Sequence, residues 1–211
     1  MSGHVWVSKA IPDPDLERRL TNDLAQRDVE AAIRADRANK NGESVPQDMC
    51  PKRLWSTEVP DKYYSHVAGP IPNLFFAGTH WIVSAKAAEI IGRFDLGGGA
   101  LYPVSEGVFE YDNRTRIPGE YFSWIFGNVK ETFLPDETPK ADSSGFLGVR
   151  WELPWEMVDG DIAVSRTALA GPDVWVDPAL FQSIFLSGPL GDALDEARLR
   201  HDFRLFRCKV V

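Results

Sequence analysis

The clearest pattern of apolar and polar positions in the chain lies between residues 74 and 104. Residues 74–83 are apolar and rich in aromatic and β-branched side chains, a pattern typical of a strand buried on both faces. From residue 85 to 94 apolar positions recur every three or four residues, which predicts an amphipathic helix. Ser84 precedes this helix, where its hydroxyl can accept a backbone hydrogen bond as an N-cap. A glycine run then stops the helix, and a return strand is expected over residues 100–104.

The same order of parts recurs near the end of the chain. Residues 181–186 resemble a strand, Ser187 stands at the cap position, residues 190–197 place apolar side chains on one helical face, and residues 203–211 read as a strand. Aligning Ser84 with Ser187 brings the two return strands nearly into register. A diverged internal duplication would explain this, and so would a chance likeness of two short apolar units. The pattern leaves both explanations open.

The N-terminal third carries a weaker pattern. Residues 5–7 predict a short strand. Asp13 and the proline after it form a typical helix start, with an acceptor at the cap and proline at the first helical position. The pattern predicts a charged surface helix from there to about Asn39, with one narrow apolar stripe. Prolines interrupt any long element over residues 41–73.

Strands and short helices are interspersed along the rest of the chain, with an exposed mobile loop expected at residues 134–144. We therefore predict an α+β fold with a mixed sheet of short strands, two strand-helix-strand units and a charged N-terminal helix. A single domain over residues 1–211 is expected. Residues 74–211 would form its core, and residues 1–73 a helix and a proline-rich arm packed on that core.

The amino-acid composition and the net charge of the chain limit the kind of partner it can bind and the compartment in which it is expected. The content of apolar residues, 44%, excludes a disordered chain, and no apolar run reaches the length of a membrane span. The first residues lack a secretory signal, so a cytoplasmic protein is expected, with no membrane association. A net charge of −8 without a basic stripe argues against nucleic-acid binding and suits a basic protein partner.

The glycine run and the two serines that could indicate a catalytic motif do not lie in the sequence context that such motifs require. Gly97 to Gly99 follow a helix, whereas a phosphate-binding loop leads into one, so a helix stop is the better interpretation. Ser84 and Ser187 lack the flanking glycines of a nucleophile elbow, and capping is the expected role of both.

The histidines and cysteines do not form metal-ligand patterns either. The four histidines are scattered: His4, His66, His80 and His201. His80 is expected to be a hydrogen-bonded core residue, and Cys50 and Cys208 to be buried reduced thiols. The sequence thus predicts no catalytic residue, no cofactor and no metal site.

Large aromatic and acidic side chains occur together after residue 150, and interface hot spots tend to contain aromatic anchors surrounded by charged residues. If Trp151, Leu153 and Trp155 belong to one strand, they share a face. That face could equally belong to the core, with the acids turned to water. The candidate partner-binding residues are Trp151, Glu152, Trp155, Glu156, Asp159 and Asp161.

Two further segments resemble the bacterial polymorphic-toxin immunity proteins of the type first named from a Myxococcus immunity domain, formerly a domain of unknown function. The first is the apolar strand ending at Ser84, with its helix and the exit Tyr102-Pro103-Val104. The second runs from Asp173-Val174-Trp175-Val176-Asp177-Pro178 through Ile184-Phe185-Leu186-Ser187 to the end of the chain. The resemblance implies a cytosolic protein that binds its cognate toxin and blocks it without catalysis.

The leading hypothesis is therefore an immunity protein that occludes a toxin through the segment after residue 150, and the acidic charge of the chain would suit a basic, nuclease-like toxin. A homodimer is compatible with this. One rival is a small hydrolase or transferase that uses His80 or His201 with a carboxylate. Another is a structural accessory subunit of a larger assembly, which a large exposed apolar patch would favour.

Overall fold

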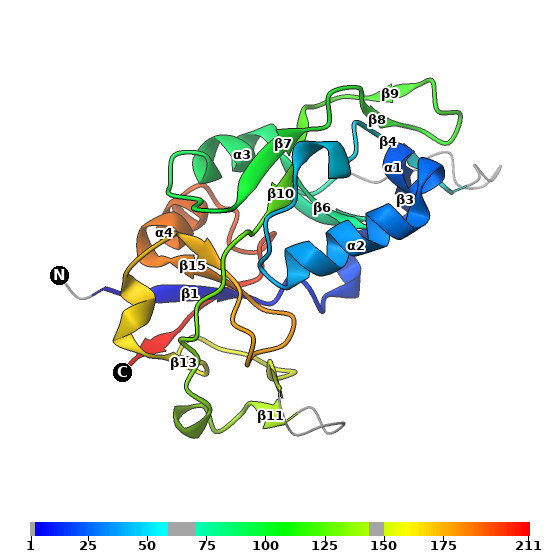
Figure 1. The fold of residues 1–211 in the computed structure, drawn as a ribbon. Coiled ribbons are helices and arrows are strands. Elements are labelled where there is room, and N and C mark those ends of the chain that lie inside the picture. Colours follow the sequence, from blue (N-terminus) through cyan, green and yellow to red (C-terminus); the bar gives the residue numbers. More distant parts are fainter. Residues whose placement is uncertain (1–2, 59–70, 144–149) are drawn as a thin grey trace.

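The computed structural model of the protein describes residues 3–58, 71–143 and 150–211. Its helices and short strands form an α+β fold with several mixed sheets (Figure 1). His66 and the proline-rich segment between residues 59 and 70, for which the sequence also gave expectations, lie outside the described residues.

The first main sheet has five strands in the order β2-β5-β6-β10-β7. They are β2 (Glu17–Arg18), β5 (Leu74–Ala77), β6 (His80–Ser84), β10 (Tyr121–Ile125) and β7 (Ala100–Pro103). β2 pairs with β5 in parallel, and all other neighbours are antiparallel. Helix α3 (Ala85–Ile91) follows β6 directly.

The second main sheet is antiparallel, in the order β14-β15-β1-β16. Its strands are β14 (Val174–Trp175), β15 (Ile184–Ser187), β1 (Val5–Ser8) and β16 (Leu205–Arg207). Helix α4 (Gly188–Glu196) follows β15, as α3 follows β6.

Four strands of the first sheet match the second sheet rung by rung. The residues that precede the two caps lie in equivalent ladders, Leu74-Val83-Phe122-Pro103 and Val174-Leu186-Trp6-Arg207. In both units the cap N–H donates to a carbonyl at the start of the neighbouring strand: Ser84 to Asn73 at 3.1 Å, Ser187 to Asp173 at 2.9 Å. In each sheet one strand lies between the strand before the helix and the strand after it. In the first sheet this strand is β10, which follows the unit in sequence; in the second it is β1, which comes from the N-terminal part of the chain. This agreement favours internal duplication over chance likeness.

The two units share one core. Helices α3 and α4 contact each other, and each also packs on strands of its own unit, α3 on β6 and β10 and α4 on β15 and β1 (Figure 1). Buried side chains from both units form a single cluster, in which the Trp124 and Phe203 rings meet edge to face at 5.6 Å between centroids. Both predicted N-caps are confirmed. The Ser84 and Ser187 hydroxyls accept from the N–H groups of Ala87 (3.3 Å) and Leu190 (3.4 Å).

Smaller sheets complete the molecule. A four-stranded one joins β3 (Leu20–Asn22), β4 (Arg53–Ser56), β8 (Gly107–Phe109) and β9 (Arg116–Ile117). Two-stranded pairs join β11 (Asp142–Ser143) to β12 (Trp151–Glu152), and β13 (Ala163–Val164) to β17 (Lys209–Val210). Short 3₁₀ turns lie at Pro14–Leu16, Gln47–Met49, Pro135–Glu137 and Arg166–Leu169.

The prediction of one strand over residues 74–83 is wrong, because the segment is a hairpin. β5 and β6 pair across Gly78 and Thr79, with Gly78 at φ +67°. The turn was not predicted because apolar residues continue on both sides of it, and a single glycine was its main turn signal in the sequence. Helix α3 also ends earlier than expected, at Ile91, with Gly92 as its C-cap.

The continuous helix predicted from Asp13 to about Asn39 is also wrong. Asp13 does cap a turn, accepting from the Asp15 N–H, but that turn is a single 3₁₀ turn followed by β2 and β3. Helices α1 (Asp23–Arg27) and α2 (Val29–Lys40) begin later, each at its own cap, Asn22 and Asp28. Pairing of β2 with β5 and of β3 with β4 breaks the expected helix, so the leucines of its stripe fall in three elements: Leu16 in the 3₁₀ turn, Leu20 in β3 and Leu24 in α1.

The segment beginning at residue 134, expected to be an exposed mobile loop, is tied to the core in its described part. Thr138 and Ala141 are buried. The Thr138 hydroxyl donates to the Leu134 carbonyl at 2.8 Å and accepts from the Ala163 N–H at 3.0 Å.

Candidate functional site

The most exposed large apolar side chain of the described residues lies in the loop over residues 153–161, which follows β12. Trp155 is 92% exposed, and Val158 in the same loop is 59% exposed. Between them, Met157 is buried against the cluster that also contains Trp175 and Phe185. The loop is therefore fixed through Met157 while it presents Trp155 to solvent.

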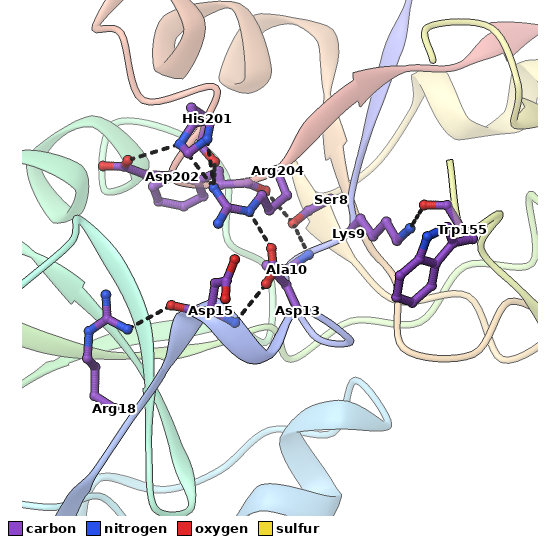
Figure 2. A network of polar contacts seen from close by, with 11 residues as sticks. Ser8, Lys9, Ala10, Asp13, Asp15, Arg18, Trp155, His201, Asp202 and Arg204 are labelled. Atoms are coloured by element: carbon purple, nitrogen blue, oxygen red, sulfur yellow. Dashed lines mark hydrogen bonds and ion pairs between the residues drawn. The ribbon is translucent and has the colours of Figure 1, made fainter. Parts of the chain in front are cut away.

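Lys9 fixes the first half of this loop. Its ammonium donates to the carbonyl oxygens of Pro154, at 2.7 Å, and of Trp155, and lies 5.5 Å from the centre of the Trp155 ring (Figure 2). Burial lowers the pKa of Lys9 below its ordinary value, partly offset by Asp13. Lys9 follows β1 directly, so the turn after this strand positions the tryptophan.

Asp159 fixes the second half. Its Oδ1 accepts from the Arg207 N–H at 2.9 Å and from Arg200 Nη2 at 2.7 Å. The Gly160 N–H donates to the Arg207 carbonyl at 2.8 Å. Burial raises the pKa of Asp159, but the hydrogen bonds from Arg207 and Arg200 outweigh it and lower the pKa overall. The carboxylate thus stays charged and holds the loop against β16.

Asp161 closes the loop on itself. Its Oδ2 accepts from the Val158 N–H at 2.9 Å, and its Oδ1 pairs with Lys140 at 2.9 Å. Burial raises the pKa of Asp161, and the hydrogen bonds from Lys140 and Val158 lower it by more. Both halves of the loop are thus tied to the rest of the chain by hydrogen bonds, the first through Lys9 and the second through Asp159 and Asp161.

A pocket of about 380 Å³ lies beside Trp155. Its walls come from the turn after β1, from Trp155 and from β16 with the residue before it. They are Lys9, Pro12, Asp13, Pro14, Asp15, Trp155, Arg204 and Phe206. Arg204 donates from Nε to Asp13 Oδ2 and from Nη1 to the His201 carbonyl at 2.6 Å (Figure 2). Burial raises the pKa of Asp13, and Arg204 with the Asp15 N–H lowers it by more.

The six predicted site residues have three kinds of surroundings. Glu152, Trp155 and Glu156 are exposed, and Asp159 and Asp161 serve within the chain as anchors. Trp151 is half-buried, with its ring centre 6.4 Å from that of Phe133. The expectation that Trp151, Leu153 and Trp155 share one strand face is wrong, because β12 ends at Glu152.

Sequence reasoning missed Lys9, Asp15, Arg204 and Val158. The first three come from opposite ends of the chain and meet only through the pairing of β1 with β16. No local signal marks them. Val158 could have been included from the sequence, because it is an apolar residue in the segment that was selected for its aromatic and acidic side chains.

The histidines lie in separate surroundings. His80 is 3% exposed, and its ring nitrogens contact the Thr79 hydroxyl at 2.9 Å and the Met49 carbonyl at 2.9 Å, which confirms a hydrogen-bonded core histidine. Burial lowers the pKa of His80. His201 is exposed and contacts Arg204 Nη1 through its ring at 3.0 Å. His4 pairs with Asp192 at 2.8 Å.

The prediction of two buried free thiols is confirmed for Cys50 and Cys208. Burial raises the pKa of Cys50 to about 12 and also raises that of Cys208, so neither is a reactive thiolate. Among residues 3–58, 71–143 and 150–211, no group of three or more His, Cys, Asp or Glu side chains is arranged to hold a metal ion.

Comparison of the chain with protein-family models found no match, and comparison with curated proteins found none either. In the described part of the chain, every helix is too short or too polar to cross a membrane.

Proposed function

We propose that this protein is an immunity protein, which binds a cognate bacterial toxin stoichiometrically and occludes it without catalysis. The observation that carries the proposal is Trp155, a tryptophan 92% exposed on a loop that is anchored at both ends. Tryptophan is normally among the more buried residues, and it is enriched at the centres of protein interfaces. A rigid loop that presents an indole to water is best explained as a preformed contact for another protein.

Charge supports a basic partner. Glu152 and Glu156 flank Trp155 in sequence and are exposed, and the chain as a whole carries a net charge of −8. Acidic groups around an apolar anchor accelerate association with a positively charged surface. A nuclease, whose active-site cleft is basic, fits this chemistry, and the cytoplasm, where such a toxin would act, is the proposed location.

The residues that carry the family resemblance lie in the core and the helix caps, and not in the proposed contact loop. Ser84 and Ser187 serve as caps, and Trp175 and Leu186 are fully buried. The matching segments therefore build the paired strand-helix units, while the proposed contact loop lies between them in sequence. This is the arrangement expected if related proteins kept a scaffold and varied the surface that meets each toxin.

The first test is co-expression of the toxin domain encoded by the adjacent reading frame, with and without this chain. Rescue of growth and a one-to-one complex are expected. Trp155→Ala should raise the dissociation constant about 30-fold or more, in line with ~2 kcal/mol for an interface hot spot. Tyr111→Ala, at a side chain 45% exposed on another part of the surface, is the matched control. Growth arrest by the toxin despite soluble, folded protein would contradict the proposal.

Charge reversal tests the electrostatic part. Glu152→Lys with Glu156→Lys should slow association about tenfold at low salt and reduce the dependence of the rate on ionic strength. Glu30→Lys with Glu120→Lys changes the net charge equally at exposed positions outside the loop. Equal slowing by both double variants would show that overall charge, and not this loop, guides association. Asp159 is left intact because its reversal would release the loop from Arg200 and Arg207.

The rival proposals fit less well. A hydrolase or transferase would need His80 or His201 beside an acid and a nucleophile in a concave site. His80 is engaged by Thr79 and the Met49 carbonyl, and His201 lies 4.0 Å from Asp202 but has a side chain 88% exposed and contacts the Arg204 guanidinium. Turnover of a small molecule, lost on replacing one histidine, would favour that alternative. A structural accessory subunit would call for a broad apolar surface, and a homodimer would be seen as doubled mass in solution without the toxin.

A further inference from the structure

The pocket beside Trp155 has apolar walls and a charged rim. Pro12, Pro14 and Phe206 line it together with the indole of Trp155. Because Trp155 is 92% exposed, at least one face of its ring stays open even with Lys9 nearby. An open indole face in a concave site is a binding surface for a cation, whose charge is attracted by the ring quadrupole.

The two cations that line the pocket are already engaged inside the protein. The Lys9 ammonium donates to two backbone carbonyls of the loop, and the Arg204 guanidinium is paired with Asp13 and bonded to the His201 carbonyl. Arg204 is neutralised by a carboxylate, whereas Lys9 keeps its charge and spends its hydrogen bonds on neutral carbonyl oxygens, so an incoming anion would have to compete with these bonds.

Of the two carboxylates that line the pocket, Asp13 is paired with Arg204, whereas Asp15 is paired with no cation of the described residues. It lies on the 3₁₀ turn Pro14–Leu16, and its side chain is exposed. Its N–H donates to Asp13 and its carbonyl accepts from Arg18, both through the backbone (Figure 2). Within the described residues, the Asp15 carboxylate itself makes no hydrogen bond or ion pair. An open carboxylate and an open indole thus line one pocket, and together they complement a positive charge.

We propose that this pocket receives a basic side chain of the protein partner, most suitably an arginine, stacked on Trp155 and paired with Asp15. A planar guanidinium can meet both requirements, because it stacks on aromatic faces and forms directed bonds to carboxylates. The inference rests on the proposed function and adds to it a defined partner group and a contact residue, Asp15, contributed from outside the loop.

The test uses the whole protein and a small probe, N-acetyl-arginine amide, with N-acetyl-citrulline amide as the neutral isostere. The ¹⁵N-labelled protein is titrated, and the indole N–H resonance of Trp155 is followed, assigned by its loss in Trp155→Phe. We expect a saturable shift in the millimolar range with arginine, and little with citrulline. Asp15→Asn should weaken binding of the arginine probe about threefold to fivefold, as expected for a surface ion pair.

Asp136→Asn removes an equal charge from an exposed position elsewhere and should leave the titration unchanged. Equal shifts with both probes, no shift with arginine, or a stronger response to N-acetyl-glutamate amide would each overturn the inference. The toxin is not used, so the two proposals fail separately. Neutralisation without arginine binding would refute the pocket assignment alone, and arginine binding without neutralisation would refute the immunity function alone.

Discussion

At the scale of single residues, side chains close together in the sequence around Trp155 differ sharply in their exposure to solvent. Met157 points into the core while Trp155 and Val158 face water. Nothing in the local sequence distinguishes these positions, because the exposure of Trp155 depends on Lys9, which reaches it from the turn after β1. The caps, by contrast, were predictable. A serine before an apolar helical pattern satisfies backbone groups only a few residues away.

His80 makes stability depend on pH. Burial lowers its pKa in the folded state, so at pH values between this pKa and the unfolded value of about 6.5 the unfolded chain binds more protons. Acidification below about pH 6.5 should therefore remove stability, by at most about 1.4 kcal/mol per pH unit.

His80→Gln can keep a donor toward the Met49 carbonyl without a titrating ring. Urea unfolding of both proteins between neutral and mildly acidic pH measures the difference. The variant should lose less stability on acidification than the parent protein, and parallel curves would show that His80 does not carry the effect.

At the scale of elements, the two strand-helix units offer a paired comparison. Both caps hold the first turn of a helix through one serine hydroxyl, but Ser84 also donates to Asn73 Oδ1 at 2.7 Å. Ser187→Ala should cost about 1 kcal/mol of unfolding free energy, and Ser84→Ala somewhat more.

Chemical denaturation of both single variants and of the double variant measures these costs. Because the caps lie on different helices, the effects should add to within about 0.5 kcal/mol. A loss from Ser187→Ala that exceeds the loss from Ser84→Ala would contradict the role assigned to the Asn73 contact.

Element boundaries were the weakest part of the sequence-based prediction. The hairpin turn at Gly78 was hidden inside an apolar run, and the leucines before α1 matched a helical period although they lie in a 3₁₀ turn, a strand and a helix. Periodicity reports which side chains are buried. It does not report which strand will pair with a segment, and pairing decided both cases.

At the scale of the whole molecule, the fit of α4 on β1 depends on one glycine. A Cβ at Gly191 would lie 2.0 Å from Trp6 Cδ1, and Trp6 is fully buried. Gly191→Ala should therefore destabilise the protein by about 3 kcal/mol or more, because the indole has no room to move.

Gly92→Ala is the matched control. There the nearest atoms to a new Cβ are the Ala88 carbonyl oxygen at 3.1 Å and Leu101 Cδ1 at 3.7 Å, so a small effect is expected. Thermal unfolding of the two variants compares them. Similar melting temperatures would mean that the sheet and α4 are less tightly packed than the contact with Trp6 indicates.

The overall class and the two repeated units followed from the sequence, whereas the surface that carries the proposed function did not. Apolar periodicity is a local property, and it identified the strands and helices that became the core. The pocket beside Trp155 joins the turn after β1 to β16 and to the loop after β12, and only the folded chain brings these together.

The placement of β1 between β15 and β16 also sets an order of events during synthesis. The ribosome makes β1 well before either of its neighbours, because most of the first main sheet and its helix lie between them in sequence. The Trp6 side of β1 therefore lacks its partner strands until β15 and β16 have been made. The strand-helix-strand unit made in one continuous stretch, with β10 as its inserted strand, can form first and offer a packed surface on which the second unit is completed.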